Sequence, residues 1–371
     1  MFQTIFVYTS LMATMMLFGM SASRQASLHP NQKTSFYKWE VMFPLLLFAV
    51  IFGMRYNVGV DHLDYLQNYK TENFHNYDLI FKWISQRCVE YDLHYTFYFG
   101  ILAFIPVFLL FYTFKDERYL FPYLAFVLFT GQYFWHWMNV IRQDIAACIF
   151  LYASRYIADK KFWKYFICYL LACGFHRTAI LLLPIYPILR GGRDFFKNIP
   201  LQLGLLLTVS VVAILEYDLV SFFNVYIEQF KEQLNYRRYS EEILYGFTEI
   251  TRTGFRFYCF LIIDIIIILY SKKLKNYYKT AAFKVFYNLY YFGAITQILF
   301  TTNLVLARPF RYFRYFMLVI SAQLLYFLYN KRTKTSFDRI ALLILLLMLS
   351  LLFYAIIARE RSFTFFWQAI T

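Results

Sequence analysis

Arginine side chains occur in this chain where water is scarce, inside or at the ends of long apolar runs. Arg142 lies within one apolar segment, Arg177 interrupts another, and Arg308, Arg311 and Arg314 lead into a third. An arginine in a membrane-spanning helix costs roughly 2.5–3.5 kcal/mol, so such residues tend to line a cavity filled by water or ligand. Guanidinium groups bind phosphate oxygens through paired hydrogen bonds and keep their charge at any relevant pH. Their convergence would form a site for a polyanion, such as a lipid phosphate or diphosphate.

Other polar residues near these arginines extend the candidate site. Asn139, Arg142 and Gln143 occupy positions i, i+3 and i+4, which places them on one face of a helix. His176 precedes Arg177 in the middle of an apolar stretch, and an imidazole titrates near neutral pH. We therefore expect both groups of residues to face the same polar cavity.

Two long polar segments add acids, bases and an aromatic ring. Asp61 and Asp64 lie in the first, and Arg237, Arg238 and Tyr239 lie in the second. A carboxylate accepts a proton or hydrogen bonds from hydroxyl groups, so the acids are candidates for a general base or for ligand positioning.

Each of these features also has a plainer explanation. The arginines at 308–314 could extend to lipid headgroups. Arg142 could pair internally with Asp144, and His176 could be an ordinary turn residue. The charged residues of the two polar segments could be solvated surface.

The elements that must position these residues are apolar segments of about 20 residues, the length that crosses a bilayer as a helix. The stretch 162–189 is interrupted at its centre, and we interpret it as a helical hairpin with its turn near His176. The first segment is interpreted as a retained helix rather than a signal peptide. With the hairpin, the sequence predicts about 12 spans; the others are 1–20, 39–54, 94–113, 119–137, 140–157, 200–217, 255–270, 283–302, 311–330 and 339–358.

The charges of the connecting loops test this arrangement. Under the twelve-span count, five loops rich in lysine and arginine fall on one side, which is the cytoplasmic side by the positive-inside rule. The long loops 55–93 and 218–254 and both chain ends then face outward, and the outer loops contribute to the cavity. The basic loops are 21–38, 158–164, 190–199, 271–282 and 331–338.

Composition excludes a soluble protein. Of the 371 residues, 60% are hydrophobic and only 16% are charged, whereas a soluble domain has roughly 25% charged residues. The net charge of +15 is explained by the basic loops rather than by nucleic-acid binding. The five cysteines show no metal-ligand spacing, and we expect no metal and no cofactor. The prediction is an all-α polytopic integral membrane protein whose residues 1–371 form a single membrane domain.

Four short motifs resemble those of the EpsG family of polysaccharide gene clusters. Residues 139–146 (NVIRQDIA) resemble its N-x-x-R-Q-x-x-A segment, and residues 171–179 (LACGFHRTA) its A-x-x-F-H-x-[ST]-A segment. Residues 59–65 (GVDHLDY) resemble its G-x-D-x-x-x-Y loop, with an additional acid before Tyr65, and residues 311–316 (RYFRYF) resemble its late Arg/Tyr-rich span. The aromatic-rich composition also resembles O-antigen polymerases of the Wzy class.

This resemblance implies a C-type-glycosyltransferase-like fold and a metal-independent polymerase of oligosaccharide repeat units linked to undecaprenyl diphosphate. It places the enzyme in the bacterial inner membrane with its active site facing the periplasm. The growing chain would leave its carrier and join the non-reducing end of an incoming unit, as in O-antigen, lipopolysaccharide or exopolysaccharide synthesis. A chain-length regulator is an expected partner, besides the lipid-linked substrates and the bilayer.

Under this hypothesis, fixed cations stabilise the departing diphosphate, with hydrogen bonds from Asn139 and Gln143. His176 is the first choice for the general base, and Asp61 or Asp64 is the second. The segment at 237–239 would clamp a glycan, with Tyr239 stacking on a sugar face. The cations would be Arg142, Arg308, Arg311 and Arg314.

Three other functions stay open at this stage. A ligase that moves glycan from the same carrier would need the same arginines. A flippase or transporter of lipid-linked sugars would need polar residues along several spans, whereas the predicted cluster is one-sided. A membrane O-acyltransferase is supported only by His176 in its apolar setting.

Overall fold

The computed structural model describes an all-helical chain, as predicted from the sequence. In the described ranges there is no strand, and one isolated antiparallel bridge joins Arg55 and Phe365. These ranges are 2–28, 35–215, 253–301, 307–331, 333–359 and 362–369.

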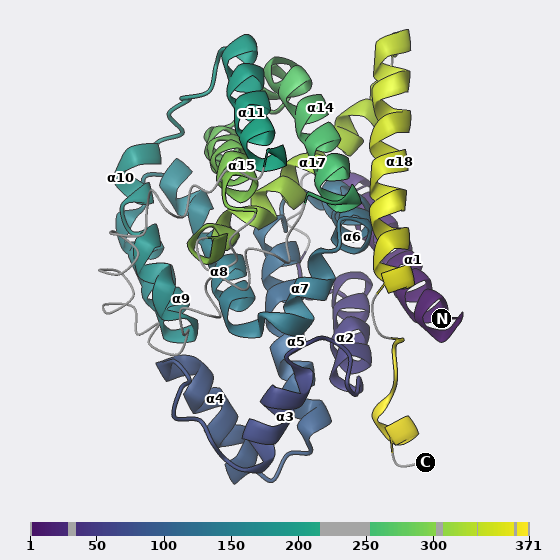
Figure 1. The fold of residues 1–371 in the computed structure, drawn as a ribbon, viewed down its shortest axis with the longest axis vertical. Coiled ribbons are helices and arrows are strands. Elements are labelled where there is room, and N and C mark those ends of the chain that lie inside the picture. Colours follow the sequence, from purple (N-terminus) through teal and green to yellow (C-terminus); the bar gives the residue numbers. More distant parts are fainter. Residues whose placement is uncertain are drawn as a thin grey trace.

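The helices follow the predicted apolar segments closely (Figure 1). Most of the second outer loop, including Arg237, Arg238 and Tyr239, lies outside the described residues. The helices are α1 Phe2–Leu28, α2 Trp39–Gly53, α3 His62–Lys70, α4 Leu79–Glu90, α5 Tyr95–Thr113, η1 Arg118–Leu120, α6 Phe121–Thr130, α7 Tyr133–Asn139, α8 Ile141–Ala158, α9 Phe162–Phe175, η2 Arg177–Leu182, α10 Ile185–Leu189, α11 Ile199–Ile214, α14 Phe255–Tyr278, α15 Ala281–Leu299, η3 Arg308–Phe313, α17 Arg314–Asn330, α18 Ser336–Arg359 and η4 Phe366–Ala369.

Within the described residues, four helices are long and apolar enough to cross a membrane: α1, α5, the continuous η3–α17 segment and α18. Five further apolar helices are shorter, among them α2, α9 and α11. This agrees with an all-helical membrane protein. The count of about twelve spans and the C-type-glycosyltransferase-like fold stay predictions.

The helices pack closely where small residues meet. Gly53 at the end of α2 faces Gly100 of α5, and a Cβ on Gly53 would lie 2.5 Å from the Thr96 carbonyl oxygen and 2.9 Å from the Gly100 Cα. Because apolar side chains gain nothing by leaving lipid, close backbone approach of this kind is a main source of helix association in a bilayer.

The predicted span 119–137 is wrong as a single helix, because it breaks at Gly131 and Gln132. Gln132 adopts a left-handed backbone with φ of 65°, and its buried side chain donates a hydrogen bond to the Leu352 carbonyl oxygen of α18. A broken helix is tolerated in a membrane protein where its backbone is buried by protein. The break releases α7 as a separate short helix that ends at Asn139.

The predicted hairpin at 162–189 is confirmed. Helix α9 ends at Phe175, His176 is extended with φ of −154° and ψ of 117°, and η2 follows at once. The two legs are joined by a hydrogen bond of 2.5 Å from the Tyr165 hydroxyl to the Leu182 carbonyl oxygen. His176 and Arg177 therefore lie at the tip of the hairpin.

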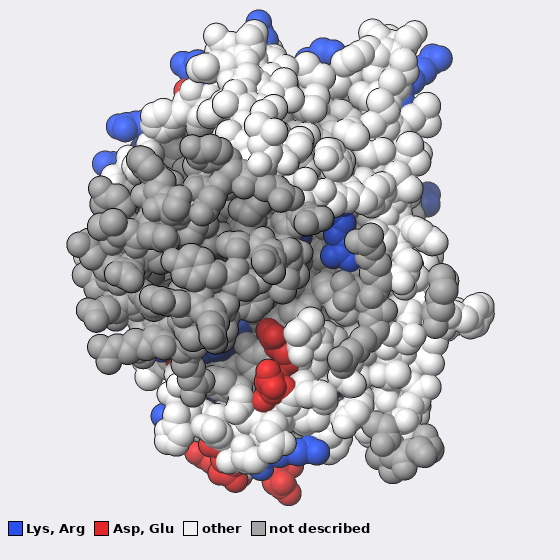
Figure 2. All heavy atoms as spheres, viewed as in Figure 1, with Lys and Arg blue, Asp and Glu red and all other residues white. Residues whose placement is uncertain are grey.

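Several basic loops lie at one end of the helix bundle, as the loop charges predicted. The amide of Gly191 donates to the Ile157 carbonyl oxygen at 3.0 Å, and Lys275 Nζ lies 2.7 Å from Asp194 Oδ1. These contacts join the loops after α8, α10 and α14. In Figure 2, lysine and arginine side chains rim this upper end, whereas acidic side chains gather on the lower half of the same face.

The C-terminal end of the described chain lies at the lower right of Figure 1, and hydrogen bonds connect both chain ends to the start of the first outer loop. The amide of Tyr56 donates to the Thr364 carbonyl oxygen at 2.9 Å. The Gln3 side chain donates to that of Gln368 at 2.9 Å. The chain ends thus share a side with loop 55–93, which agrees with the predicted topology.

Candidate active site

A clamped loop forms one wall of the candidate site. Gly59 has φ of +96°, and a Cβ there would lie 2.9 Å from Asn139 Oδ1 and 3.1 Å from the Met138 carbonyl oxygen. Asn139 Oδ1 accepts a hydrogen bond of 2.5 Å from the Val60 amide, and its Nδ2 donates to the Trp135 carbonyl oxygen at 2.9 Å. The predicted ligand-binding residue Asn139 is buried, and its two contacts fix the backbone that leads into Asp61.

Arg55 secures the same loop from beneath. Its side chain is 1% exposed, and it donates to the carbonyl oxygens of Phe52, Val58 and Met138 at 2.7, 3.3 and 3.5 Å. No ion-pair partner of Arg55 occurs among the described residues. Carbonyl oxygens therefore satisfy a buried cation whose desolvation would otherwise be costly. In the sequence, Arg55 resembled an ordinary loop residue after an apolar run.

Beside this loop lies a polar cavity of about 290 Å³ between α3, the segment 71–78 and the start of α8. It brings together three of the predicted catalytic residues, Asp61, Asp64 and Arg142. The remaining lining residues were not predicted, although the concentration of asparagine in positions 68–76 was a usable signal. The full lining is Asp61, Asp64, Tyr65, Asn68, Asn73, Asn76, Tyr77 and Arg142.

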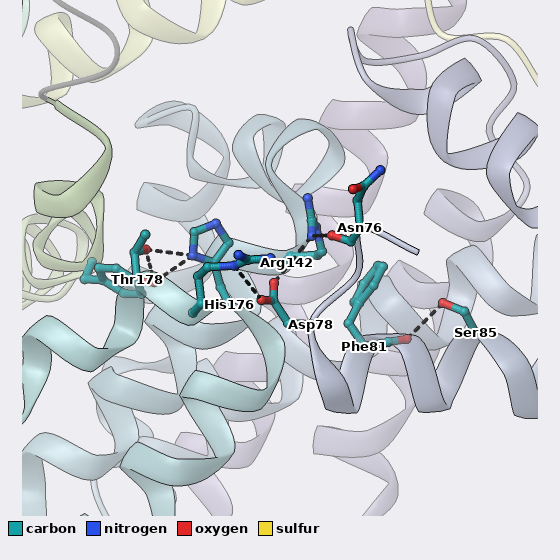
Figure 3. Close-up of polar contacts among 9 residues, drawn as sticks. Asn76, Asp78, Phe81, Ser85, Arg142, His176 and Thr178 are labelled. Atoms are coloured by element: carbon teal, nitrogen blue, oxygen red, sulfur yellow. Dashed lines mark hydrogen bonds and ion pairs between the residues drawn. The ribbon is translucent and has the colours of Figure 1, made fainter. Parts of the chain in front are cut away.

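Arg142 forms the inner wall of the cavity and is anchored by the first outer loop (Figure 3). Its Nη1 donates to the Asn76 carbonyl oxygen at 2.9 Å and lies 3.4 Å from Asp78 Oδ2. Its guanidinium carbon lies 5.2 Å from the centre of the Tyr77 ring. The other oxygen of Asp78 lies 3.3 Å from Arg177 Nε. Asp78 thus bridges two arginines, and the pairing of Arg142 with Asp144 considered from the sequence is replaced by a pairing with Asp78.

His176 belongs to a cluster of hydroxyl groups at the hairpin tip. Its Nδ1 lies 2.7 Å from Thr178 Oγ1 and 3.1 Å from the Tyr312 hydroxyl, and these two oxygens are 2.8 Å apart. One of the two ring nitrogens is therefore already engaged in contacts with hydroxyl groups.

Asp61 shares the electrostatic environment of the arginines. Burial and the neighbouring Asp64 raise the pKa of Asp61, while Arg308, Arg311 and Arg142 oppose this increase. Neither aspartate side chain forms a hydrogen bond or ion pair in the described part of the chain. The structure therefore places Asp61 between a second carboxylate and three cations, with its oxygens available to a ligand.

The remaining predicted residues lie further around the site. Gln143 is buried and donates to the Arg308 carbonyl oxygen at 2.5 Å, which fixes the start of η3. The Arg314 guanidinium carbon lies 5.7 Å from the centre of the Tyr133 ring of α7. Within the described ranges there is no group of three or more His, Cys, Asp or Glu side chains suited to a metal ion. The roles of these residues in binding and catalysis stay predictions.

Comparison with known proteins gives one match. The EpsG family model matches residues 38–369, which include all four motifs that resembled the family. No curated protein and no solved structure matches the chain. Because the match covers most of its length, the chain belongs to the EpsG family, which is associated with Wzy-type polymerases.

Proposed function

We propose that this protein joins oligosaccharide repeat units linked to undecaprenyl diphosphate at the periplasmic face of the bacterial inner membrane. Membership of the EpsG family supports a polysaccharide polymerase-type role in general. The polar cavity next to Arg308 and Arg311 supports the more specific statement. The location of the cavity at the end opposite the basic loops supports the periplasmic side, because basic loops stay in the cytoplasm.

The proposed reaction is a single glycosyl transfer. A hydroxyl oxygen of the acceptor unit attacks the anomeric carbon of the donor sugar, and the bond between that carbon and the diphosphate oxygen breaks. The electron pair leaves with undecaprenyl diphosphate, and the hydroxyl proton passes to a protein base. Arg308 and Arg311, whose charges act on Asp61, would stabilise the negative charge that develops on the leaving group.

The geometry favours Asp61 over His176 as the base. Asp61 lines the cavity and has no protein partner among the described residues. His176 is not among the residues that line the cavity, and its Nδ1 contacts Thr178 and Tyr312. A base must reach the proton that it removes, so we propose Asp61 for this step and assign His176 to holding the hairpin tip against η3.

The observation on which this proposal depends is the cavity beside a group of arginines, which holds two carboxylates without a hydrogen bond or ion pair to any described residue. The test compares Asp61→Asn and Arg308→Gln with Asp92→Asn, which alters an exposed aspartate of the same outer loop outside the cavity. Each variant is produced in a host lacking its own polymerase, and glycan ladders are compared at equal membrane abundance.

We expect single repeat units in the first two variants and long polymers in Asp92→Asn. Polymer that accumulates on its carrier would identify a ligase instead, and loss of all repeat units from the outer face would identify a flippase. Long polymers in both Asp61→Asn and Arg308→Gln at normal abundance would refute the site assignment.

A further inference from the structure

The polar cavity and the arginines beside it differ in charge. The cavity lining contains two carboxylates, Asp61 and Asp64, against the one guanidinium of Arg142, which leaves a formal charge of −1. The charge of Arg142 is also balanced by Asp78, whose Oδ2 lies 3.4 Å away. A diphosphate placed here would meet two carboxylates that form no ion pair with the cations of the described residues. The lining therefore disfavours an anion.

The same lining suits an uncharged ring with many hydroxyl groups. Asn68 and Asn73 offer carboxamides, each with two donor hydrogens and an acceptor oxygen. Tyr65 and Tyr77 add aromatic rings, whose centres lie 6.0 Å apart. A hexose at interior packing density occupies on the order of 200 Å³, and the cavity of about 290 Å³ holds one such ring with room for its linkage.

We propose that this cavity binds the non-reducing terminal sugar of the acceptor unit and that the donor diphosphate binds outside it, towards Arg308 and Arg311. This assignment rests on the proposed polymerase function. The reacting sugar of the donor is bonded directly to a diphosphate and requires cations next to it. The reacting sugar of the acceptor lies at the far end of its unit from any phosphate. Only the acceptor sugar matches a pocket of net negative charge, and only the acceptor hydroxyl needs the carboxylate found there.

Binding of a glycan without phosphate tests the assignment. The probe is the repeat-unit oligosaccharide of the host polysaccharide, released from its carrier by mild acid. Its binding to the purified full chain in lipid nanodiscs is followed by saturation-transfer difference NMR. We expect the strongest transfer to the non-reducing terminal ring and no displacement by inorganic diphosphate. The proposal would be overturned by any of three results with the unaltered protein: no binding, saturation transfer confined to the reducing end, or competition by diphosphate.

A double variant tests the residues. Asn68→Ala with Asn73→Ala removes two carboxamides from the lining and is expected to weaken oligosaccharide binding about tenfold, the effect of losing two neutral hydrogen bonds. Asn330→Ala removes an exposed asparagine at the end of α17, outside the cavity, and serves as the matched control. Equal affinity in the folded double variant and in the control would refute the lining as the binding surface.

Failure of the proposed polymerase function would give different results from failure of the pocket assignment. Arg308→Gln should bind the free oligosaccharide normally while failing to polymerise lipid-linked units in proteoliposomes. If the unaltered protein binds the oligosaccharide as predicted but forms no polymer, the polymerase assignment fails and the glycan pocket stands. If it forms polymer but does not bind the free oligosaccharide, the pocket assignment fails alone.

Discussion

Replacement of Gly59 by alanine should disable the site without unfolding the protein. A Cβ at this position would lie 2.9 Å from Asn139 Oδ1 and 3.1 Å from the Met138 carbonyl oxygen, and the φ of +96° disfavours any residue with a Cβ. The backbone strain is on the order of 1–3 kcal/mol. Moving Asn139 aside would break its hydrogen bond with the Val60 amide, at a cost of about 0.5–1.5 kcal/mol.

Together these effects amount to about 1.5–4.5 kcal/mol at one loop. Because the loop continues directly into Asp61, it would relax by moving that carboxylate relative to the cavity. A misplacement of about 1 Å costs on the order of a hundredfold in rate. We therefore expect polymerisation to fall about a hundredfold in Gly59→Ala, measured as incorporation of lipid-linked repeat units by purified protein in proteoliposomes.

The matched control is Gly204→Ala in α11. A Cβ on Gly204 meets nothing within 4 Å, so this variant should polymerise at the normal rate. Both proteins are compared at equal abundance after size-exclusion chromatography. A Gly59→Ala protein that is monodisperse and fully active would refute the inference that the clamped loop positions Asp61.

Three further outcomes follow from the same geometry. A base acts only when deprotonated, and the pKa of Asp61 is raised. The rate of polymerisation should therefore be lost as pH falls through a value above the ordinary aspartate pKa of about 4. A rate that stays constant down to this pH would contradict the role of Asp61 as the base. Arg142→Lys should lower the rate at least about tenfold, because an ammonium lacks the planar group that lies over the Tyr77 ring while Nη1 contacts the Asn76 carbonyl oxygen and Asp78. A wild-type rate would show that this arrangement is dispensable. His176→Gln should keep most of the activity in the same assay, and complete loss at normal abundance would restore His176 as the base.

The sequence predicted the elements whose formation depends on local composition. Apolar runs marked the helices, and the polar interruption at Gly174, His176 and Arg177 marked the hairpin turn. Loop charges predicted the end at which the basic loops meet. These features depend on the transfer of each segment between water and lipid, which composition alone largely determines.

Features that depend on tertiary contacts were not predictable in this way. The break between α6 and α7 follows a single glycine in a run that is otherwise continuous, and Gln132 is stabilised there by a carbonyl oxygen of a helix more than 200 residues away. Arg55 is buried because three carbonyl oxygens meet around it. In the sequence, Asn68 and Asn73 resembled solvated loop residues. Their segment lines a cavity only because Arg142, from a distant part of the chain, lies opposite it.

The charge arrangement also couples the two substrates. Arg308 and Arg311 now oppose the increase in the pKa of Asp61. A donor diphosphate bound beside these arginines would offset their positive charge, so the pKa of Asp61 would rise further and the carboxylate would become a stronger base. Proton removal from the acceptor would then be favoured when the leaving group is in place. Before the donor arrives, the same arginines oppose the increase in the pKa of Asp61 and so favour the charged carboxylate that would hold the acceptor hydroxyl.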